Sequence, residues 1–332
     1  MSSPKVLIFF FKRELERLLQ EELPGVEVKQ FTRRLSDAAL EEKSAFLSEV
    51  EVIFGSPSLM TNVIPRCPNL KWIQSVTAGV ESVIKEVTEH ENTDIILTRN
   101  GETFAQPMSE HVITLILACN KGLYKCHDQQ KQAIFQRRNI HPKSLALSSV
   151  GILGLGCIGR ETARICKAFG SKVWGMTRTT VSEDSKCPYV DQYRTMSDLH
   201  EILSECDYVV NILPSTAQTR GILSGEVFSH CKKGATFINV GRGDVTDEES
   251  VIKALRNKWL QYAALDVHNP EPLPASSPLW SEPGVIITPH ISGGYAGTEN
   301  YEQSRAKMFM EQYRRYINNE PLEYVVDLNR GY

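Results

Sequence analysis

The segment Val150-Gly151-Ile152-Leu153-Gly154-Leu155-Gly156-Cys157-Ile158-Gly159 decides the fold of this chain. An apolar run leads into the spacing G-x-G-x-x-G, and a helical pattern follows from Arg160 to Phe169. In that context the glycines allow a tight turn, a close approach to a pyrophosphate and close packing of helix on strand. The helix N-terminus offers N–H groups and a positive dipole to phosphates. We therefore predict a dinucleotide site at Gly154, Gly156, Cys157, Ile158 and Gly159, with a purely structural glycine turn as the alternative.

The next predicted strand, 172–176, ends without the acidic residue that binds the ribose of NAD. Thr177, Arg178 and Thr179 stand there instead. A guanidinium binds a phosphate through two hydrogen bonds, whereas a carboxylate would repel it. The sequence therefore favours NADP (as NADPH) over NAD at these three residues, and an exposed loop arginine is the alternative.

Short apolar runs alternate with helical patterns on both sides of the glycine loop, which indicates parallel βαβ units and an α/β fold. Strands are predicted at 5–11, 26–31, 50–54, 71–76, 94–98, 149–153, 172–176, 207–213, 235–240, 262–267 and 285–288. Helices are predicted at Arg13 to Leu23, Asp37 to Ser48, Ser109 to Phe135 and Glu302 to Ile317.

The overall composition is that of a globular protein of about two domains, since the chain has 332 residues. Lys and Arg number 37 against 40 Asp and Glu, and the net charge of -3 argues against a dedicated nucleic-acid binder. No apolar window has the length of a membrane span. The opening run 6–11 is too short for a signal peptide, so we expect a cytoplasmic protein.

The eight cysteines are dispersed and form no C-x-x-C pair, so we expect reduced thiols and no zinc or other metal site. They are Cys67, Cys119, Cys126, Cys157, Cys166, Cys187, Cys206 and Cys231.

Three later strands are followed by charged or titratable side chains: Arg242, Glu271 and His290. Open parallel sheets bind ligands outside the carboxyl ends of their strands, so we predict that these side chains form a catalytic site. The pKa of a histidine lies near working pH, so His290 can act as a proton donor. Glu271 can orient its ring, and Arg242 can bind a carboxylate. The remaining histidines are interpreted as structural: His90, His111, His127, His141, His200, His230 and His268.

A loop in the first hundred residues is a candidate for substrate binding. Thr77, Ala78 and Gly79 lie between a predicted strand and a helix, where exposed N–H groups can bind a carboxylate. An ordinary turn is the alternative.

Four motifs together resemble the D-isomer-specific 2-hydroxyacid dehydrogenases. They are G-L-G-C-I-G at 154–159, N-V-G-R-G-D at 239–244, L-D-V-H-N-P-E-P-L-P at 265–274 and I-T-P-H at 287–290. Within the family the chain is most similar to the glyoxylate/hydroxypyruvate reductase branch, on the evidence of T-R-T at 177–179, S-P-L-W at 277–280 and N-R-G-Y at 329–332.

The resemblance implies two Rossmann-like or flavodoxin-like domains with parallel sheets. A dinucleotide domain at 103–293 would be inserted into a discontinuous substrate domain made of 1–102 and 294–332. It also implies further cofactor-binding residues: Met108, Leu213, Pro214, Thr219, Val240, Gly241, Arg242, Asp266, His290 and Gly293. A homodimer through the helix at 109–123 and the arm after it is implied too, with Phe135 as the counterpart of a residue that enters the partner's site.

The activity implied by the resemblance is the reduction of glyoxylate and hydroxypyruvate to D-2-hydroxyacids, with His290 as the proton donor. Two alternatives stay open: a dehydrogenase for larger D-2-hydroxyacids, and a dinucleotide-sensing protein of the corepressor type. Formate dehydrogenases resemble the chain less, because Glu271 stands where they use an amide. The run after His290 is longer than in many family members, and Tyr295 within it could reach the cleft, which leaves the substrate open.

Overall fold

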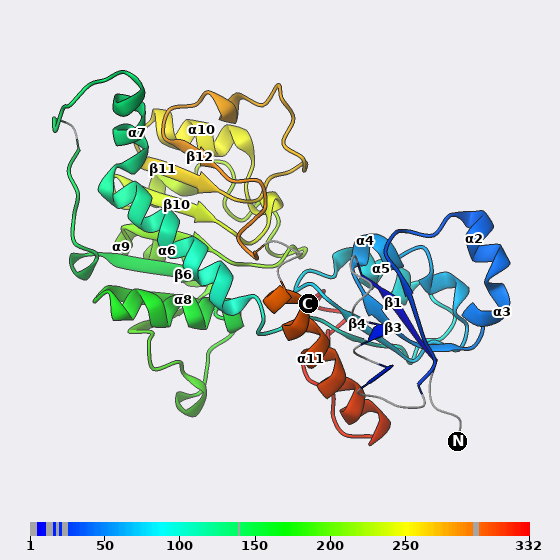
Figure 1. The fold of residues 1–332 in the computed structure, drawn as a ribbon. Coiled ribbons are helices and arrows are strands. Elements are labelled where there is room, and N and C mark those ends of the chain that lie inside the picture. Colours follow the sequence, from blue (N-terminus) through cyan, green and yellow to red (C-terminus); the bar gives the residue numbers. More distant parts are fainter. Residues whose placement is uncertain (1–4, 11–15, 18–19, 22–25, 139, 295–298) are drawn as a thin grey trace. The chain divides into compact units, whose positions relative to one another are not determined.

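The computed structural model describes residues 5–10, 16–17, 20–21, 26–138, 140–294 and 299–332, with the side chains of 299–302 excepted. The chain divides into two compact units, one of Met1–Thr103 with Tyr295–Tyr332 and one of Phe104–Gly294. Each unit contains a parallel sheet with helices packed on it (Figure 1). This confirms the α/β fold with two parallel sheets that the alternating pattern predicts.

The first unit is built on five parallel strands in the order β2-β1-β3-β4-β5, which is the flavodoxin-like order. The strands are β1 (Lys5–Phe9), β2 (Val28–Phe31), β3 (Val50–Gly55), β4 (Trp72–Ser75) and β5 (Ile96–Thr98). The helices are α2 (Asp37–Glu42), α3 (Ser44–Leu47), α4 (Pro57–Met60), α5 (Glu81–Thr88) and α11 (Glu299–Ile317).

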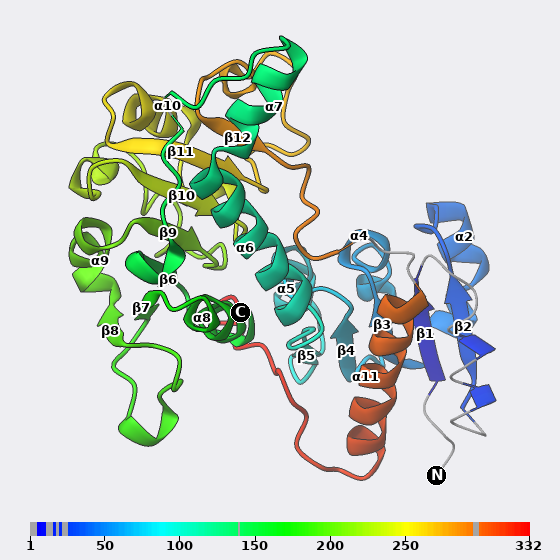
Figure 2. The same ribbon diagram turned by 60° about the vertical axis from the view of Figure 1, so that its left-hand side comes forward.

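The core of this unit lies on both faces of its sheet, which explains why its strands are apolar nearly throughout. Leu7 and Ile73 belong to the core on one face. On the other face the rings of Phe54 and Trp72 stack on Phe309 of α11, with centroids 4.3 and 5.5 Å apart. Helix α11 near the C-terminus therefore covers one face of a sheet whose first strand begins at residue 5 (Figure 2).

The second unit is built on seven parallel strands in the order β12-β11-β10-β9-β6-β7-β8. The strands are β6 (Ser149–Leu153), β7 (Lys172–Thr177), β8 (Gln192–Thr195), β9 (Tyr208–Asn211), β10 (Ala235–Asn239), β11 (Leu260–Leu265) and β12 (Val285–Ile287). The helices are α6 (Ala105–Lys121), α7 (Leu123–Lys131), α8 (Cys157–Ala168), α9 (Leu199–Glu205) and α10 (Glu248–Arg256). The chain order reverses between β6 and β9, the place where Rossmann sheets bind dinucleotides.

Alternating side chains of the strands supply two separate cores in this unit, since successive residues of a strand point to opposite faces. Val150 and Ile152 of β6 pack with Val112 of α6 on one face. Leu153 packs with Leu203 of α9 on the other face. Helices α6 and α8 thus lie on one side of the sheet, and α9 and α10 on the other (Figures 1 and 2).

Two of the predicted helices are wrong in extent. The predicted helix Ser109 to Phe135 is two helices, because Gly122 between them has φ +65° and ends α6 in a left-handed conformation. The predicted helix Asp37 to Ser48 is likewise two short helices, α2 and α3.

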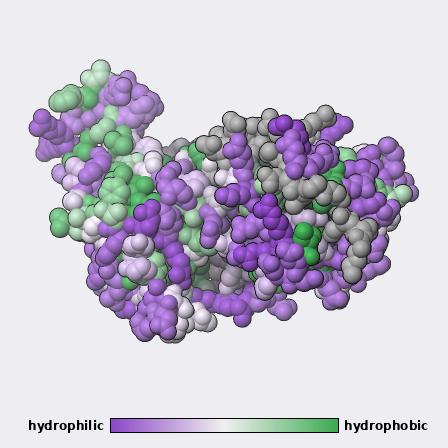
Figure 3. Space-filling view, turned by 60° about the horizontal axis from the view of Figure 1, so that its bottom comes forward, coloured by the Kyte–Doolittle hydropathy of each residue, from purple (hydrophilic) through white to green (hydrophobic). Residues whose placement is uncertain are grey.

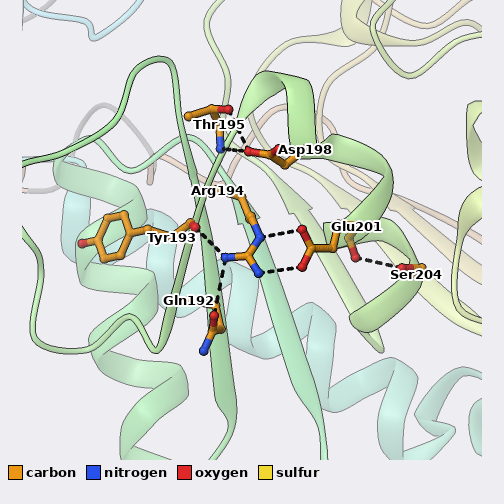
Figure 4. Close-up of polar contacts among 7 residues, drawn as sticks. All are labelled: Gln192, Tyr193, Arg194, Thr195, Asp198, Glu201 and Ser204. Atoms are coloured by element: carbon orange, nitrogen blue, oxygen red, sulfur yellow. Dashed lines mark hydrogen bonds and ion pairs between the residues drawn. The ribbon is translucent and has the colours of Figure 1, made fainter.

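Strand β8 was absent from the sequence prediction, and its composition explains why. It is a half-buried edge strand of sequence QYRT that has no apolar run. Arg194 in this strand donates to both carboxylate oxygens of Glu201 at 2.6 Å, and its guanidinium lies over the ring of Trp174 at 4.9 Å. Figure 4 shows this ion pair, which joins the edge strand to α9. Strand β8 pairs with β7 through its backbone and is held by these side-chain contacts, without an apolar pattern that the sequence could reveal.

Some predictions lie outside the described residues. They concern most of the predicted helix Arg13 to Leu23, the end of the first strand at Phe11, and Tyr295. The face drawn in Figure 3 is mostly hydrophilic, with smaller hydrophobic patches between the polar side chains. In the described part of the chain, no helix combines the length and the apolar character that crossing a membrane requires.

Candidate active site

The glycine loop joins β6 to α8 and leaves open space at one of its glycines. Gly154 has φ +108°, a conformation that favours glycine. A Cβ added to Gly156, the N-cap of α8, would meet no atom within 4 Å. A Cβ added to Gly159 would lie 2.0 Å from the carbonyl oxygen of Gly154. Gly156 thus leaves space for a ligand at the helix N-terminus, whereas Gly159 allows α8 to pack on the loop, and Cys157 and Ile158 begin that helix.

The turn after β7 carries no acidic side chain at the position of an NAD-binding carboxylate. Thr177 donates from Oγ1 to the carbonyl oxygen of Thr179 at 2.8 Å, which folds the turn. Arg178 between them is exposed. The turn therefore carries a cation, Arg178, and two threonine hydroxyl groups. It lies at the end of the strand next to the one that leads into the glycine loop.

The loops after β9 and β10 contact each other. A Cβ added to Gly241 would lie 2.7 Å from the carbonyl oxygen of Leu213, so the two backbones touch. Thr219 donates from Oγ1 to the carbonyl oxygen of Pro214 at 2.6 Å and so closes the first loop. Leu213, Thr219 and Val240 are buried, and Pro214 is half-buried.

Two buried amides, which the sequence reasoning missed, support these loops. Asn211 at the end of β9 donates from Nδ2 to Oδ1 of Asn239 at 2.9 Å. Asn239 at the end of β10 donates from Nδ2 to the carbonyl oxygen of Arg242 at 2.9 Å. An asparagine at the end of each of two apolar strands was the available signal.

His290 and Glu271 form a direct pair. Nδ1 of His290 lies 2.7 Å from Oε2 of Glu271, and Oε1 of Glu271 accepts from the backbone N–H of His268 at 2.8 Å. The hydrogen bond to Glu271 raises the pKa of His290, against the effect of burial. Burial works to raise the pKa of Glu271, but the hydrogen bonds from His290 and His268 outweigh it and lower that pKa. The pair therefore favours an imidazolium beside a carboxylate.

Arg242 lies near this pair. The pKa of His290 is raised mainly by the hydrogen bond to Glu271, and the positive charge of Arg242 acts in the opposite direction. Nη1 of Arg242 donates to the carbonyl oxygen of Gly241 at 2.7 Å. A Cβ added to the next residue, Gly243, would lie 2.1 Å from the carbonyl carbon of His268. The loop of Arg242 thus packs directly against the loop that leads to Glu271.

Asp266, one of the cofactor-binding residues that the resemblance implies, has no exposed surface in the structure. Its carboxylate accepts from Oγ1 of Thr288 at 2.5 Å and from the backbone N–H groups of Ile291 and Ser292 at 2.9 Å. Its carbonyl oxygen accepts from the N–H of His290, which has φ +54°. Burial opposes ionisation, but these hydrogen bonds outweigh it and lower the pKa of Asp266. In this structure Asp266 therefore anchors the loop of His290 instead of exposing its carboxylate to a ligand.

The other predicted cofactor residues of this unit lie on α6 and after β12. Met108 of α6 is half-buried against the core. A Cβ added to Gly293 would lie 3.0 Å from the ring of Phe104, so this glycine permits close packing. No group of three His, Cys, Asp or Glu side chains among the described residues could hold a metal ion.

The predicted substrate loop belongs to the other unit and follows β4. Thr77 donates from Oγ1 to the carbonyl oxygen of Gly79 at 2.6 Å. The buried Asn100 donates from Nδ2 to the carbonyl oxygen of Val76 at 3.1 Å, and its N–H donates to Thr77 at 3.1 Å. Thr77, Ala78 and Gly79 are half-buried. The loop is therefore held by the hydrogen bonds of Asn100 and is partly open to solvent.

The second unit therefore brings together a glycine loop, a cation and a hydrogen-bonded acid–base pair, all at strand ends of one sheet. A proton donor and a guanidinium in such a place can polarise and protonate a carbonyl group.

Comparisons with known proteins point to one family. Residues 113–292 match the family described as "D-isomer specific 2-hydroxyacid dehydrogenase, NAD binding domain". The chain is 30% identical over 270 residues to glyoxylate/hydroxypyruvate reductase A of Salmonella newport (strain SL254), covering 79% of this chain and 82% of the relative.

Solved structures give the same result. A D-isomer specific 2-hydroxyacid dehydrogenase family protein of Aeromonas salmonicida superposes with a TM-score of 0.83 at 31% identity, covering 98% of this chain and 100% of the other. An NADPH-dependent glyoxylate/hydroxypyruvate reductase of Sinorhizobium meliloti, solved with NADP and sulfate, superposes with a TM-score of 0.82 at 28% identity, covering 99% and 100%.

Proposed function

Because this chain belongs to the D-isomer specific 2-hydroxyacid dehydrogenase family, we propose that it reduces small 2-oxoacids to D-2-hydroxyacids with NADPH. Glyoxylate and hydroxypyruvate are the first substrates to test, because relatives carry their names. The observation that carries the proposal is the 2.7 Å contact between His290 and Glu271 beside Arg242.

The proposed roles follow from the atoms that each side chain has available. Nδ1 of His290 is engaged by Glu271, so Nε2 is the atom that delivers a proton to the substrate oxygen. The raised pKa keeps the imidazole protonated to higher pH, which suits reduction. Arg242 binds the substrate carboxylate and opposes the charge that develops on the carbonyl oxygen. When bound, the dinucleotide supplies the hydride.

The residues present fit a dinucleotide with a 2′-phosphate. Gly156 leaves open space at the N-terminus of α8, where N–H groups and the helix dipole favour a pyrophosphate. Arg178 and its threonine neighbours supply donors for the extra phosphate. We expect Arg178→Ala to raise the KM for NADPH by about ten-fold to a hundred-fold, roughly the worth of a charge-assisted contact, and to leave the KM for NADH nearly unchanged. Equal effects on both cofactors would remove Arg178 from this role.

The function itself is tested by initial rates of nicotinamide oxidation. NADPH and NADH are each combined with glyoxylate, hydroxypyruvate, pyruvate and a bulky phenyl-substituted 2-oxoacid. Fast turnover of the small acids with NADPH is the expected result. A preference for the bulky acid would move the proposal to larger D-2-hydroxyacids. Tight cofactor binding without turnover of any acid would favour a dinucleotide-sensing protein.

We further propose that the chain forms a homodimer through α6 and the arm after it. Helix α7 has no buried residue, and Phe135 and Leu147 are 95% and 85% exposed. Apolar side chains presented in this way are typical of a surface that a second protein covers. Sedimentation should give the mass of two chains, and Phe135→Ser with Leu147→Ser should shift it toward one. A wild-type monomer at micromolar concentration would contradict the proposal.

A cytoplasmic location is proposed on the state of the thiols. All eight cysteines are free in the structure, as expected for a reducing compartment. Cell fractionation with the reductase assay tests this, and activity confined to a membrane or secreted fraction would contradict it.

A further inference from the structure

A second histidine reaches the loop that carries His290. His111 lies on α6, and its Nε2 is 3.3 Å from Oγ1 of Thr288 and 3.7 Å from Oδ1 of Asp266. Only 16% of its side chain is exposed. The contact joins residues 177 positions apart in the chain, so sequence proximity does not produce it. Helix α6 is thereby connected to the segment that follows β12.

The direction of these hydrogen bonds follows from the number of protons available. Thr288 has one hydroxyl proton, and it is donated to Asp266 at 2.5 Å. Oγ1 of Thr288 can then only accept from His111, so Nε2 of His111 carries a proton. Burial lowers the pKa of His111, against the charge of Asp266. The neutral imidazole with its proton on Nε2 is therefore the form that completes the network.

We propose that His111 is a positioning residue for His290, acting through Thr288 and Asp266; this rests on the proposed reductase function. Asp266 binds the backbone at residues 290, 291 and 292, including His290 in its left-handed conformation. The carbonyl oxygen of Asp266 holds the N–H of His290, and its carboxylate holds the N–H groups of the next two residues, so the orientation of the carboxylate bears on the backbone beside His290. His111 fixes the Thr288 hydroxyl on that carboxylate from α6, whose Val112 and Ile116 are fully buried.

Loss of the His111 donor should therefore affect chemistry more than binding. The Thr288 hydroxyl becomes free to rotate away from Asp266, and the loop of His290 loses one of its supports. The glycine loop and Arg178 belong to other elements and keep their structure. Small displacements of a catalytic group lower turnover strongly, whereas cofactor affinity does not depend on this loop alone.

The test compares His111→Leu, which removes the donor, with His111→Gln, whose amide nitrogen can replace it. We expect His111→Leu to lower kcat about ten-fold, with the KM for NADPH and glyoxylate within about two-fold of wild type. His111→Gln should recover most of the loss. Thr288→Val should lower kcat as well, and the double variant His111→Leu/Thr288→Val should be no slower than Thr288→Val alone, because coupled residues are not additive.

Several results would overturn the role of His111. They are an unchanged kcat in His111→Leu, equal losses in the Leu and Gln variants, or losses that multiply in the double variant. Each requires an active wild-type enzyme. A wild-type chain that turns over no 2-oxoacid would overturn the proposed function instead, and with it the reaction that His111 is inferred to serve.

Discussion

The variant His290→Gln should lose about 10²-fold to 10⁴-fold in kcat for 2-oxoacid reduction, the usual contribution of a positioned general acid. Glutamine cannot supply a proton, but it retains a polar group next to Glu271. NADPH binding, followed by fluorescence titration, should change little, because the glycine loop is a separate element. A variant that keeps its activity would show that water or another group protonates the substrate.

The pH dependence of the reduction rate is a second test of the role proposed for His290. Glu271 raises the pKa of His290, so the reduction rate should be high at low pH and should fall as the pH rises through that pKa. Glu271→Gln removes the carboxylate, and the pKa of His290 should fall. The declining limb of kcat/KM for reduction should therefore move to lower pH, whereas oxidation of the D-hydroxyacid, which needs neutral imidazole, should begin at lower pH. An unshifted profile would show that the pair does not control the proton.

The variant Gly156→Ala should have the second large effect. It should weaken cofactor binding without affecting folding. The Cβ would enter open space, and the backbone of Gly156, at φ -73° and ψ -164°, suits alanine. We expect an unchanged melting temperature but a loss of about ten-fold to a hundred-fold in NADPH affinity, because the methyl group occupies the approach to the pyrophosphate. Isothermal titration and thermal melting measure the two quantities.

Gly159→Ala is the matched variant. Its Cβ would lie 2.0 Å from the Gly154 carbonyl oxygen, and a backbone atom cannot be moved aside as a flexible side chain can. Overpacking of this kind costs on the order of 1–3 kcal/mol, so this variant should lose both stability and NADPH affinity. If Gly156→Ala bound NADPH as tightly as wild type, the loop would be a structural turn and not the cofactor site.

Sequence reasoning predicted the parallel strands well where burial on both faces gives a continuous apolar run, as in β6 and β10. It missed β8, which pairs with β7 but has no apolar pattern; its Arg194 contacts Glu201 and Trp174 instead. It also extended the helix past Gly122, because one glycine inside a helical pattern does not reveal a left-handed φ.

In the site, motif spacing predicted His290, Glu271 and Arg242 as catalytic residues, since each follows a strand of the same parallel sheet. The supporting residues were harder to find. His111 looked like a structural histidine on an apolar helix, and its contact with Thr288 depends on tertiary packing. Asn211 and Asn239 form a pair only because β9 and β10 are neighbours in the sheet. Residues that support a site through contacts between distant segments leave little trace in a single sequence.

The left-handed backbone conformation of His290 lowers the stability of the folded protein. A residue with a Cβ is disfavoured in that region by about 1–2 kcal/mol relative to glycine. Selection for heat resistance alone would therefore favour glycine or asparagine at position 290, and the resulting protein would be more stable but would lack the proton donor proposed here. The proposed proton donor therefore carries a stability cost at this position.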